Sequence, residues 1–337
     1  MSEEMCERIL LAHGGGGILM KELVGRIVAK LGGAGGPLQD SATLPIEGGR
    51  ISFTTDSFVV SPLFFPGGDI GRLAVCGTVN DLAMSGARPV WLSLSFIIEE
   101  GLTFEAFDRI LDSIAAAALE AGVVVATGDT KVVERGKADG IFINTSGIGV
   151  VPAGVEVSSA FARSGDAVLI NGGIGEHGLA IMSRREGIDF GIDIESDTAP
   201  LSNITAPLLA GVKTVRSMRD ATRGGLASIL NEIAEDSKVC IRVVEEAIPV
   251  SEAVRKGCEL MGYDPLHIAN EGKFVAVVAK EDADKALAIM RAHPLGRGAA
   301  RIGEVAAGPA GVVILKTAFG GERVVDVPYG DMLPRIC

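Results

Sequence analysis

Strand-like and helix-like segments alternate along most of this 337-residue chain, and Pro152-Ala153-Gly154 interrupts the alternation near its middle. Apolar and β-branched runs predict strands, and apolar residues at helical spacing predict helices. Predicted strands of the first half lie at 51–60, 90–98, 123–127 and 140–150, and predicted helices at 69–85 and 103–121. In the second half the predicted strands are 166–171, 239–244, 274–278, 301–305 and 311–315, and the predicted helices are 176–185, 206–217, 226–235, 251–261 and 281–293. Both halves mix helix and sheet, so we predict an α/β (α+β mixed) chain whose two domains meet at a cleft.

The break and the composition of the ends suggest four regions. We predict a glycine-rich N-terminal segment at 1–40, an N-terminal domain at 41–152, a C-terminal α/β domain at 153–327, and a flexible tail at 328–337. The tail contains Pro328, Gly330 and Pro334, which favour turns or extended backbone, and it ends in Cys337. Ten extended residues reach roughly 35 Å, so a terminal thiol could visit two sites as a carrier. A frayed terminus that happens to end in cysteine is the alternative.

Charge and cysteine content exclude several classes of protein. The net charge of -12 argues against a nucleic-acid partner. The five cysteines have no C-x-x-C spacing, so neither a zinc site nor a disulfide framework is indicated, and a reducing cytoplasm fits best. The N-terminus lacks a basic leader, and the longest apolar run, 90–98, is too short to span a bilayer. We therefore expect a soluble cytoplasmic protein without a membrane partner.

Three aspartates stand at strand ends or beside small residues and suggest a magnesium site. They are Asp56, Asp81 and Asp129, with Asn80 and Thr130 next to the second and third. Carboxylate, amide and hydroxyl oxygens are the hard ligands that Mg²⁺ selects. Each aspartate alone also suits a turn or a helix cap. Asp81 is the exception, because it falls inside an apolar helical pattern where an unpaired carboxylate is costly.

Two further features could contact phosphate. Lys131 follows Asp129 by two residues and could supply a point charge to a phosphate, although without further context a solvated hairpin lysine is slightly favoured. His13, Gly14 and Gly15 begin a His-Gly-Gly-Gly-Gly run whose backbone N–H groups could cover a phosphate or a peptide. This run lacks the spacing of a Walker loop, and a plain linker remains possible.

The second half offers an anion site, a base and scattered histidines. The segment from Asp220 to Gly225, which includes Arg223, leads into a predicted helix whose N-terminus could meet an anion. Glu271, before the strand at 274–278, could serve as a general base if it lines the cleft, or could simply be solvated. His177, His267 and His293 show no metal-binding spacing, and we expect them to be surface or packing residues.

Taken together, these segments resemble a known family. The segments are 13–17, Thr54-Thr55-Asp56-Ser57, 77–87, Gly128-Asp129-Thr130-Lys131, 220–225, Asn270-Glu271-Gly272 and the terminal Pro334-Arg335-Ile336-Cys337. They are similar to those of the hydrogenase maturation factor HypE family, over essentially the whole chain. The middle segments also resemble the wider group of aminoimidazole ribonucleotide synthetase, selenophosphate synthetase and thiamine-monophosphate kinase, which activate substrates with ATP. The terminal Pro-Arg-Ile-Cys narrows the resemblance to the HypE branch.

The resemblance implies a PurM-like two-domain fold, a homodimer formed by the N-terminal, ATP-binding domains, and a reaction at Cys337. Cys337 would receive a carbamoyl group from the carbamoyltransferase HypF, and ATP would drive dehydration of the S-carboxamide to an S-cyanide. The cyanide would pass to iron held by the partners HypC and HypD, as a ligand of a [NiFe]-hydrogenase.

The same resemblance implies roles for individual residues. Asp56, Asp81 and Asp129 would hold Mg²⁺ on the ATP phosphates, with Asn80 and Thr130 as supporting ligands. Glu271 would remove the proton from the carboxamide nitrogen, and Lys131 would stabilise charge on its oxygen. Two alternatives stay open: another ATP-dependent enzyme of the wider group that acts on a small free metabolite, and a non-catalytic scaffold whose thiol docks a partner.

Overall fold

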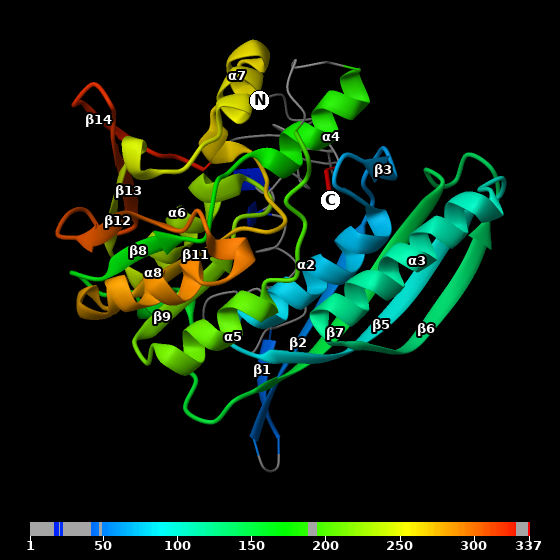
Figure 1. The fold of residues 1–337 in the computed structure, drawn as a ribbon, viewed down its shortest axis with the longest axis horizontal. Coiled ribbons are helices and arrows are strands. Elements are labelled where there is room, and N and C mark those ends of the chain that lie inside the picture. The colour runs from blue at the N-terminus through cyan, green and yellow to red at the C-terminus, as the bar shows by residue number, and fades with distance from the viewer. Residues whose placement is uncertain (1–16, 20, 23–41, 47–48, 188–193, 328–335) are drawn as a thin grey trace.

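The computed structural model describes residues 17–19, 21–22, 42–46, 49–187, 194–327 and 336–337. The described residues form two sheets with helices packed on them, one sheet from each half of the chain (Figure 1). None of the described helices combines the length and apolar character needed to cross a membrane.

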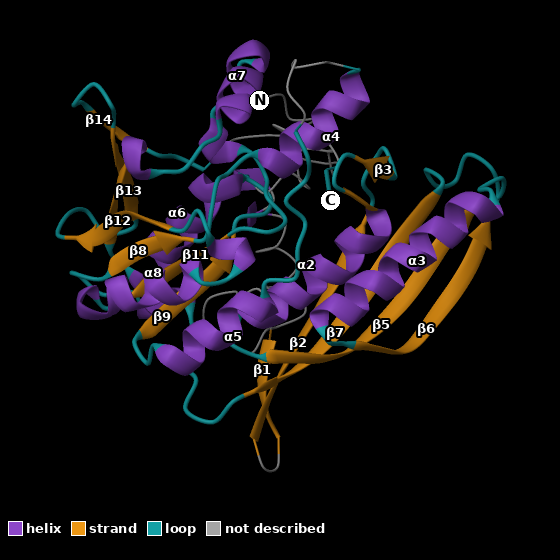
Figure 2. Ribbon diagram, in the orientation of Figure 1, coloured by secondary structure: helices purple, strands orange, loops and turns teal. Residues whose placement is uncertain are grey.

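The first sheet carries two helices on one face. Its described strands run in the order β1 (Ala42–Ile46), β2 (Gly49–Phe58), β7 (Ile141–Val151), β5 (Arg88–Glu99) and β6 (Val124–Val133). All neighbours are antiparallel except β5 and β6, which are parallel. The helices α2 (Ile70–Met84) and α3 (Phe104–Ala121) lie along this sheet (Figure 2). A small ribbon of β3 (Phe64–Phe65) and β4 (Gly68–Asp69) precedes α2.

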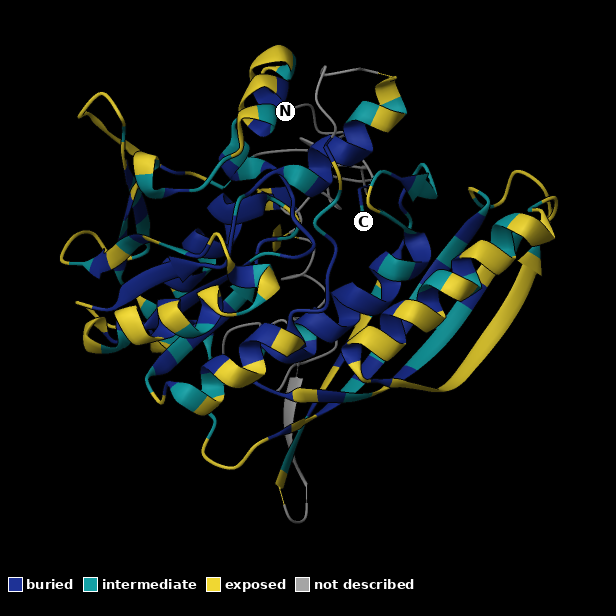
Figure 3. Ribbon diagram, viewed as in Figure 1, coloured by how far each residue is buried: buried dark blue, intermediate teal, exposed yellow. Residues whose placement is uncertain are grey.

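Local sequence explains where these two helices begin and end. The Asp69 side chain accepts the N–H groups of Gly71 and Arg72 at 2.7 and 3.1 Å, which caps α2. The Thr103 hydroxyl caps α3 in the same way, and α3 ends at Gly122 in the left-handed conformation, φ 69°. Because α2 is buried along nearly its whole length, it forms the centre of the molecule (Figure 3).

The second sheet is built from the second half of the chain. Its described strands run in the order β14 (Glu322–Val324), β13 (Val312–Lys316), β10 (Cys240–Val244), β12 (Ala300–Ala306), β8 (Ala167–Ile170), β11 (Phe274–Val278) and β9 (Val215–Asp220). Its helices are α4 (Glu176–Glu186), α5 (Ser202–Gly211), α6 (Gly225–Ser237), α7 (Glu252–Met261) and α8 (Ala283–Arg291). Short 3-10 turns lie at Ser159–Phe161, Glu245–Ala247, Pro265–His267, Lys280–Asp282 and Pro294–Gly296.

Two predicted elements differ from the structure. The predicted helix at 206–217 is wrong: α5 is shifted towards the N-terminus, and the strand β9 follows it after a short turn. Val215 to Asp220 are extended because they pair with the central strand β11, a long-range contact that local spacing does not reveal. The strand predicted at 123–127 continues to Val133, so Asp129, Thr130 and Lys131 lie within β6.

The two halves share apolar clusters, one of which reaches the C-terminus. That cluster joins Phe58 and Leu73 of the first half to Leu179 and Ile268 of the second, and it includes Ile336 from the C-terminus. Burial of such side chains contributes roughly 1.5 to 3 kcal/mol each. This shared cluster holds the face of the first domain, with α2 and the end of β2, against the loops of the second.

Candidate active site

Two carboxylates of the first domain lie together where it meets the second. Asp56 comes from β2 and Asp81 from α2, and their carboxyl groups share a hydrogen bond. The hydroxyl of Thr54 donates to Asp81 Oδ2 at 2.7 Å, and that of Thr78 donates to Asp56 Oδ2 at 3.3 Å. Burial raises the pKa of Asp56, while the Arg223 guanidinium and the hydrogen bonds with Asp81 and Thr78 oppose the rise. Two carboxyl groups that share a hydrogen bond also share a proton, and a cation could take the place of that proton between them.

The second domain contributes a buried glutamate on a rigid loop. Glu271 is 3% exposed, and its backbone N–H donates to Asp197 Oδ1 at 2.9 Å. The neighbouring Gly272 is required here, because a Cβ on it would lie 1.9 Å from the carbonyl oxygen of Asp197. On the other side, Asn270 Nδ2 donates to Ala221 O at 2.9 Å. These contacts fix the backbone that carries the Glu271 side chain from both sides.

The pKa of Glu271 is raised well above its ordinary value. Burial is the largest cause, and the nearby carboxylates Asp220, Asp197 and Asp56 add to it, while Arg223 opposes it. Asp220, also buried, has its pKa raised to about 6, mainly by burial. A buried glutamate with a raised pKa is a stronger base than a solvated one and is typical of a catalytic group.

Cys337 lies beside these groups. Burial raises the pKa of its thiol to about 12; Arg223 lowers it, and Glu271 and Asp56 raise it further. The pKa of Arg223 is raised in turn, with Cys337 the largest cause. The terminal carbonyl of Cys337 accepts the N–H of Val59 at 3.3 Å. The C-terminal sulfur thus reaches the same place as the predicted base and the cation of the 220–225 segment.

The residue before Cys337 is held by a histidine from α4. His177 is fully buried, and its Nε2 lies 2.7 Å from the carbonyl oxygen of Ile336. Our expectation that His177 is a surface or ordinary packing residue is therefore wrong. Its place in the first turn of a helix after a glycine-rich run was visible in the sequence. Its partner lies 159 residues further along the chain, and local spacing could not indicate it.

Asn80 is positioned differently from the prediction. It is fully buried; its Nδ2 donates to the carbonyls of Ala199 and Glu271, both at 3.1 Å, and its Oδ1 accepts the N–H of Leu201 at 2.7 Å. The amide thus joins α2 to the second domain and steadies the Glu271 loop. Its oxygen points to a backbone N–H, which leaves it poorly suited to hold a metal ion.

Asp129, Thr130 and Lys131 lie away from this cluster within one chain. They are exposed on β6, where Lys131 Nζ and Asp129 Oδ2 form an ion pair at 2.6 Å. The strands β7 and β5 separate β6 from β2, which amounts to roughly 14 Å at about 4.8 Å per strand. Within the described part of the chain, no three histidine, cysteine or acidic side chains are grouped to hold a metal ion. The expected trio of Asp56, Asp81 and Asp129 is therefore not assembled by a single chain.

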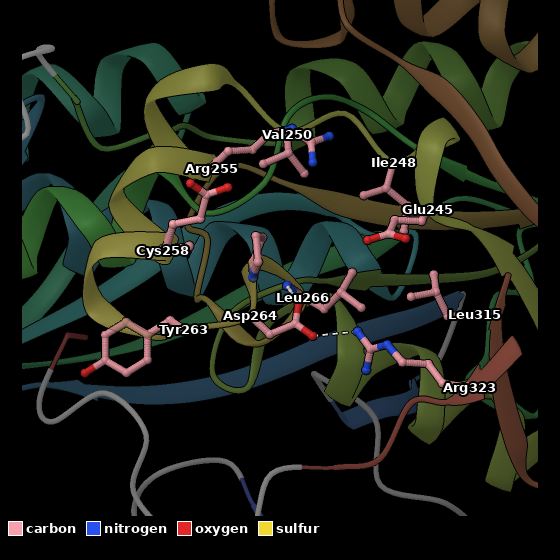
Figure 4. A pocket seen from close by; sticks show the side chains of 12 residues that line it. Glu245, Ile248, Val250, Arg255, Cys258, Tyr263, Asp264, Leu266, Leu315 and Arg323 are labelled. Atoms are coloured by element: carbon pink, nitrogen blue, oxygen red, sulfur yellow. Dashed lines mark hydrogen bonds and ion pairs between the residues drawn. The ribbon is translucent and has the colours of Figure 1, made fainter. Parts of the chain in front are cut away.

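Other predictions fall elsewhere. His13, Gly14 and Gly15 lie outside the described residues. A separate hollow of about 150 Å³ lies beside α7, lined by residues that include Cys258, Tyr263 and Arg323, the last paired with Asp264 at 2.6 Å (Figure 4). None of the predicted site residues lines it.

Comparisons with known proteins agree with this architecture. Residues 38–151 match the model of the AIR synthase related protein N-terminal domain, and residues 163–316 match that of its C-terminal domain. The chain is 54% identical over 336 residues to carbamoyl dehydratase HypE of Rhizobium leguminosarum bv. viciae, covering 98% of this chain and 95% of that protein. The predicted two-domain, PurM-like fold is confirmed.

Two solved structures are similar over most of their length. A crystal structure of a HypE–HypF complex contains a chain that is 49% identical, with a TM-score of 0.86, covering 91% of this chain and 99% of that one. A crystal structure of the hydrogenase maturation protein HypE in complex with ATP is 45% identical, with a TM-score of 0.83, covering 98% and 100%.

Proposed function

Because the chain belongs to the carbamoyl dehydratase HypE family, we propose that it uses ATP to dehydrate a carboxamide on the sulfur of Cys337 to a thiocyanate. The thiocyanate supplies the cyanide ligand of the iron in a [NiFe]-hydrogenase. The observation that carries the proposal is the position of Cys337, a partly buried residue that lies beside Glu271, Arg223 and Asp56. A terminal thiol without such a function would have no reason to lie among two carboxylates and a guanidinium.

The chemistry needs a better leaving group and a base. The carboxamide oxygen attacks the γ-phosphorus of ATP, which releases ADP and leaves a phosphorylated imidate on the sulfur. Loss of the remaining N–H proton and departure of phosphate then complete the C≡N bond. Glu271 accepts protons from the nitrogen, since it is held rigidly next to the sulfur and its raised pKa makes it a competent base. Arg223 faces the same sulfur and stabilises negative charge that develops on the transferred oxygen.

Within a single chain, Asp56 and Asp81 are placed to hold a magnesium ion. Their carboxyl groups share a hydrogen bond, so they lie close enough for a divalent cation to replace the shared proton and bind both. When bound, Mg²⁺ neutralises phosphate charge. The hydroxyls of Thr54 and Thr78 keep the two carboxylates in place. Asn80 would not contact the metal ion; its role is indirect, because it holds the Glu271 loop in place.

Lys131, Asp129 and Thr130 act in a homodimer. The face of the first sheet opposite α2 and α3 exposes Phe53, Trp91 and Ile97, which are 40%, 49% and 44% exposed. The edge strand β6 is exposed throughout and carries Val124 and Val132, which are 60% and 69% exposed. Exposed apolar surface of this kind, beside an unpaired strand edge, favours association with a second copy. In that dimer β6 of one copy brings its Lys131, Asp129 and Thr130 to the Asp56 and Glu271 of the other.

The partners follow from the chemistry of the tail. The transferase HypF loads Cys337 with the carbamoyl group, a proposal that the HypE–HypF complex of a close relative supports. HypC and HypD, which hold the iron, then accept cyanide from the same sulfur. Both exchanges require the sulfur to leave its buried position.

The test is mass analysis of the C-terminal peptide after incubation with carbamoyl phosphate, ATP and the transferase. We expect a gain of one carbamoyl group followed by loss of one water, both absent in Cys337→Ala. The Ala variant should still bind ATP. A carbamoylated peptide that never loses water in the presence of Mg²⁺-ATP would contradict the proposal.

A further inference from the structure

The carbonyl oxygen of Ile336, the residue before Cys337, lies against the ring of His177. Both ring nitrogens of this histidine have hydrogen-bond partners. A carbonyl oxygen can only accept, so His177 Nε2 carries the proton and donates to Ile336 O at 2.7 Å. The other ring nitrogen, Nδ1, lies 2.8 Å from the hydroxyl of Ser196 and accepts from it. Burial is the main cause of the lowered pKa of His177, so the ring is neutral.

The ring has little freedom to turn. The hydroxyls of Ser196 and Thr198 are hydrogen-bonded at 2.7 Å, and the N–H of Ser196 donates to the carbonyl of Pro66 at 2.8 Å. The ring of Phe65 meets that of His177 edge-on, with centroids 5.7 Å apart. The donor nitrogen is therefore aimed by contacts that do not involve the C-terminus.

Ile336 and Cys337 are held by two backbone hydrogen bonds and by the packing of an apolar side chain. Ile336 is 4% exposed and belongs to a cluster shared by both domains. The carbonyl of Cys337 accepts from Val59, in the first domain, at 3.3 Å, and that of Ile336 accepts from His177, in the second. Neither hydrogen bond uses the sulfur, so both can form whether the sulfur is free, carbamoylated or cyanated.

We propose that His177 is a positioning residue that latches the C-terminus, so that Cys337 is held beside Glu271 regardless of the group on its sulfur. The purpose of the latch rests on the proposed function, because only a tail that leaves and returns needs one. The latch itself concerns the unloaded protein and can be tested without ATP or carbamoyl phosphate.

The experiment measures alkylation of Cys337 by iodoacetamide, followed on the C-terminal peptide by mass spectrometry. When docking is fast, the rate follows the population of undocked C-terminus. His177→Leu keeps the size but removes the donor, and we expect a roughly tenfold faster reaction, the effect of about 1.4 kcal/mol for a buried hydrogen bond. His177→Gln keeps a donor and should stay within about twofold of the unaltered protein. Ser196→Ala, which frees the ring to change tautomer, should fall between the two.

Two controls separate a latch from general loosening. His293→Leu removes a histidine whose Nδ1 accepts the N–H of Leu295, and it should leave the Cys337 rate unchanged. Cys258, which is 2% exposed, reports on the fold and should not react faster in any variant. In carbamoylated protein, His177→Leu should slow single-turnover dehydration while the Kd for ATP stays the same.

An unchanged Cys337 rate in His177→Leu would overturn the proposal, as would equal acceleration in the Leu and Gln variants. If Cys258 becomes reactive in His177→Leu, the Ser196→Ala variant decides, and an unchanged rate there counts against the latch. A third outcome separates the two proposals. If Cys337 is alkylated faster in His177→Leu but the unaltered enzyme never dehydrates its carbamoyl group, the proposed function is refuted and the latch stands.

Discussion

Replacing Asn80 with alanine should cost far more stability than its single side chain suggests. The substitution leaves the N–H of Leu201 and the carbonyl of Ala199 without their partner, and it leaves the carbonyl of Glu271 with only the N–H of Ala199 at 3.4 Å, in a place with no solvent access. A buried polar group without a partner costs about 1 to 3 kcal/mol. The two carbonyls share one amide nitrogen, so the costs of the three groups do not simply add. We expect the free energy of unfolding to fall by about 3 to 5 kcal/mol in total, which is at the upper end for single substitutions.

The assay is urea unfolding followed by circular dichroism, with the free energy of unfolding extrapolated to water and the m-value checked for constancy. Asn203→Ala is the matched control, since Asn203 is exposed and makes one hydrogen bond, to Glu120 O at 3.1 Å. It should change the free energy by less than about 0.5 kcal/mol. The folded Asn80→Ala variant should bind Mg²⁺-ATP nearly normally but dehydrate slowly, because the Glu271 loop has lost a support.

The opposite result would refute this reasoning. If Asn80→Ala changed the free energy of unfolding by less than 1 kcal/mol, roughly the worth of one ordinary hydrogen bond, and weakened Mg²⁺-ATP binding more than tenfold, Asn80 would be a ligand as the sequence first suggested.

Three further predictions test the site. Glu271→Gln should accept the carbamoyl group normally but form thiocyanate roughly 10² to 10⁴ times more slowly, as judged by the mass of the C-terminal peptide over time; a normal rate would exclude Glu271 as the base. The raised pKa of Asp220 means that the folded protein binds more protons than the unfolded chain, so its contribution to stability is present at low pH and is lost as pH rises through about 6. Asp220→Asn should therefore weaken the fall in unfolding free energy between about pH 4 and 6, measured by urea titration at each pH; parallel curves for both proteins would contradict this. Mixing inactive Lys131→Ala and inactive Glu271→Gln chains should restore about a quarter of the dehydratase activity if each site draws on two copies, whereas no recovery would place both residues in one chain's site.

How well the sequence predicts an element depends on whether local contacts decide its conformation. The strand β11 has the predicted bounds, because Phe274 to Val278 form a continuous apolar run that is buried on both faces. The strand β9 was missed because Arg216 and Arg219 interrupt its apolar pattern, and only pairing with β11 makes it extended.

The same distinction holds for the site. The structure brings together Arg223, Cys337, Glu271, Asp56 and Asp81. From local spacing alone, each of them could also have had an ordinary structural role. The separation of Lys131 from Asp56 depends on the order of strands in the first sheet, which no local pattern encodes. His177 illustrates the same limit, since its role depends on a contact with the far end of the chain.

The site suits a carbamoylated Cys337 better than a Cys337 with a free thiol. A docked thiol with a pKa of about 12 is almost fully protonated at neutral pH, compared with about 8.5 for a solvated cysteine, so it is a poor nucleophile where it lies. Carbamoylation therefore proceeds elsewhere, with the sulfur near solvent or in the transferase. A carboxamide, like the protonated thiol, carries no charge that the neighbouring Glu271 and Asp56 could repel, so the loaded sulfur can lie in the same place. The carboxylates that suppress the free thiol's reactivity are then placed to use their own basicity on the carboxamide nitrogen. Because the docked thiol is neutral and gains no ion pair with Arg223, most of the energy that docks the C-terminus comes from apolar packing of Ile336 and from backbone hydrogen bonds.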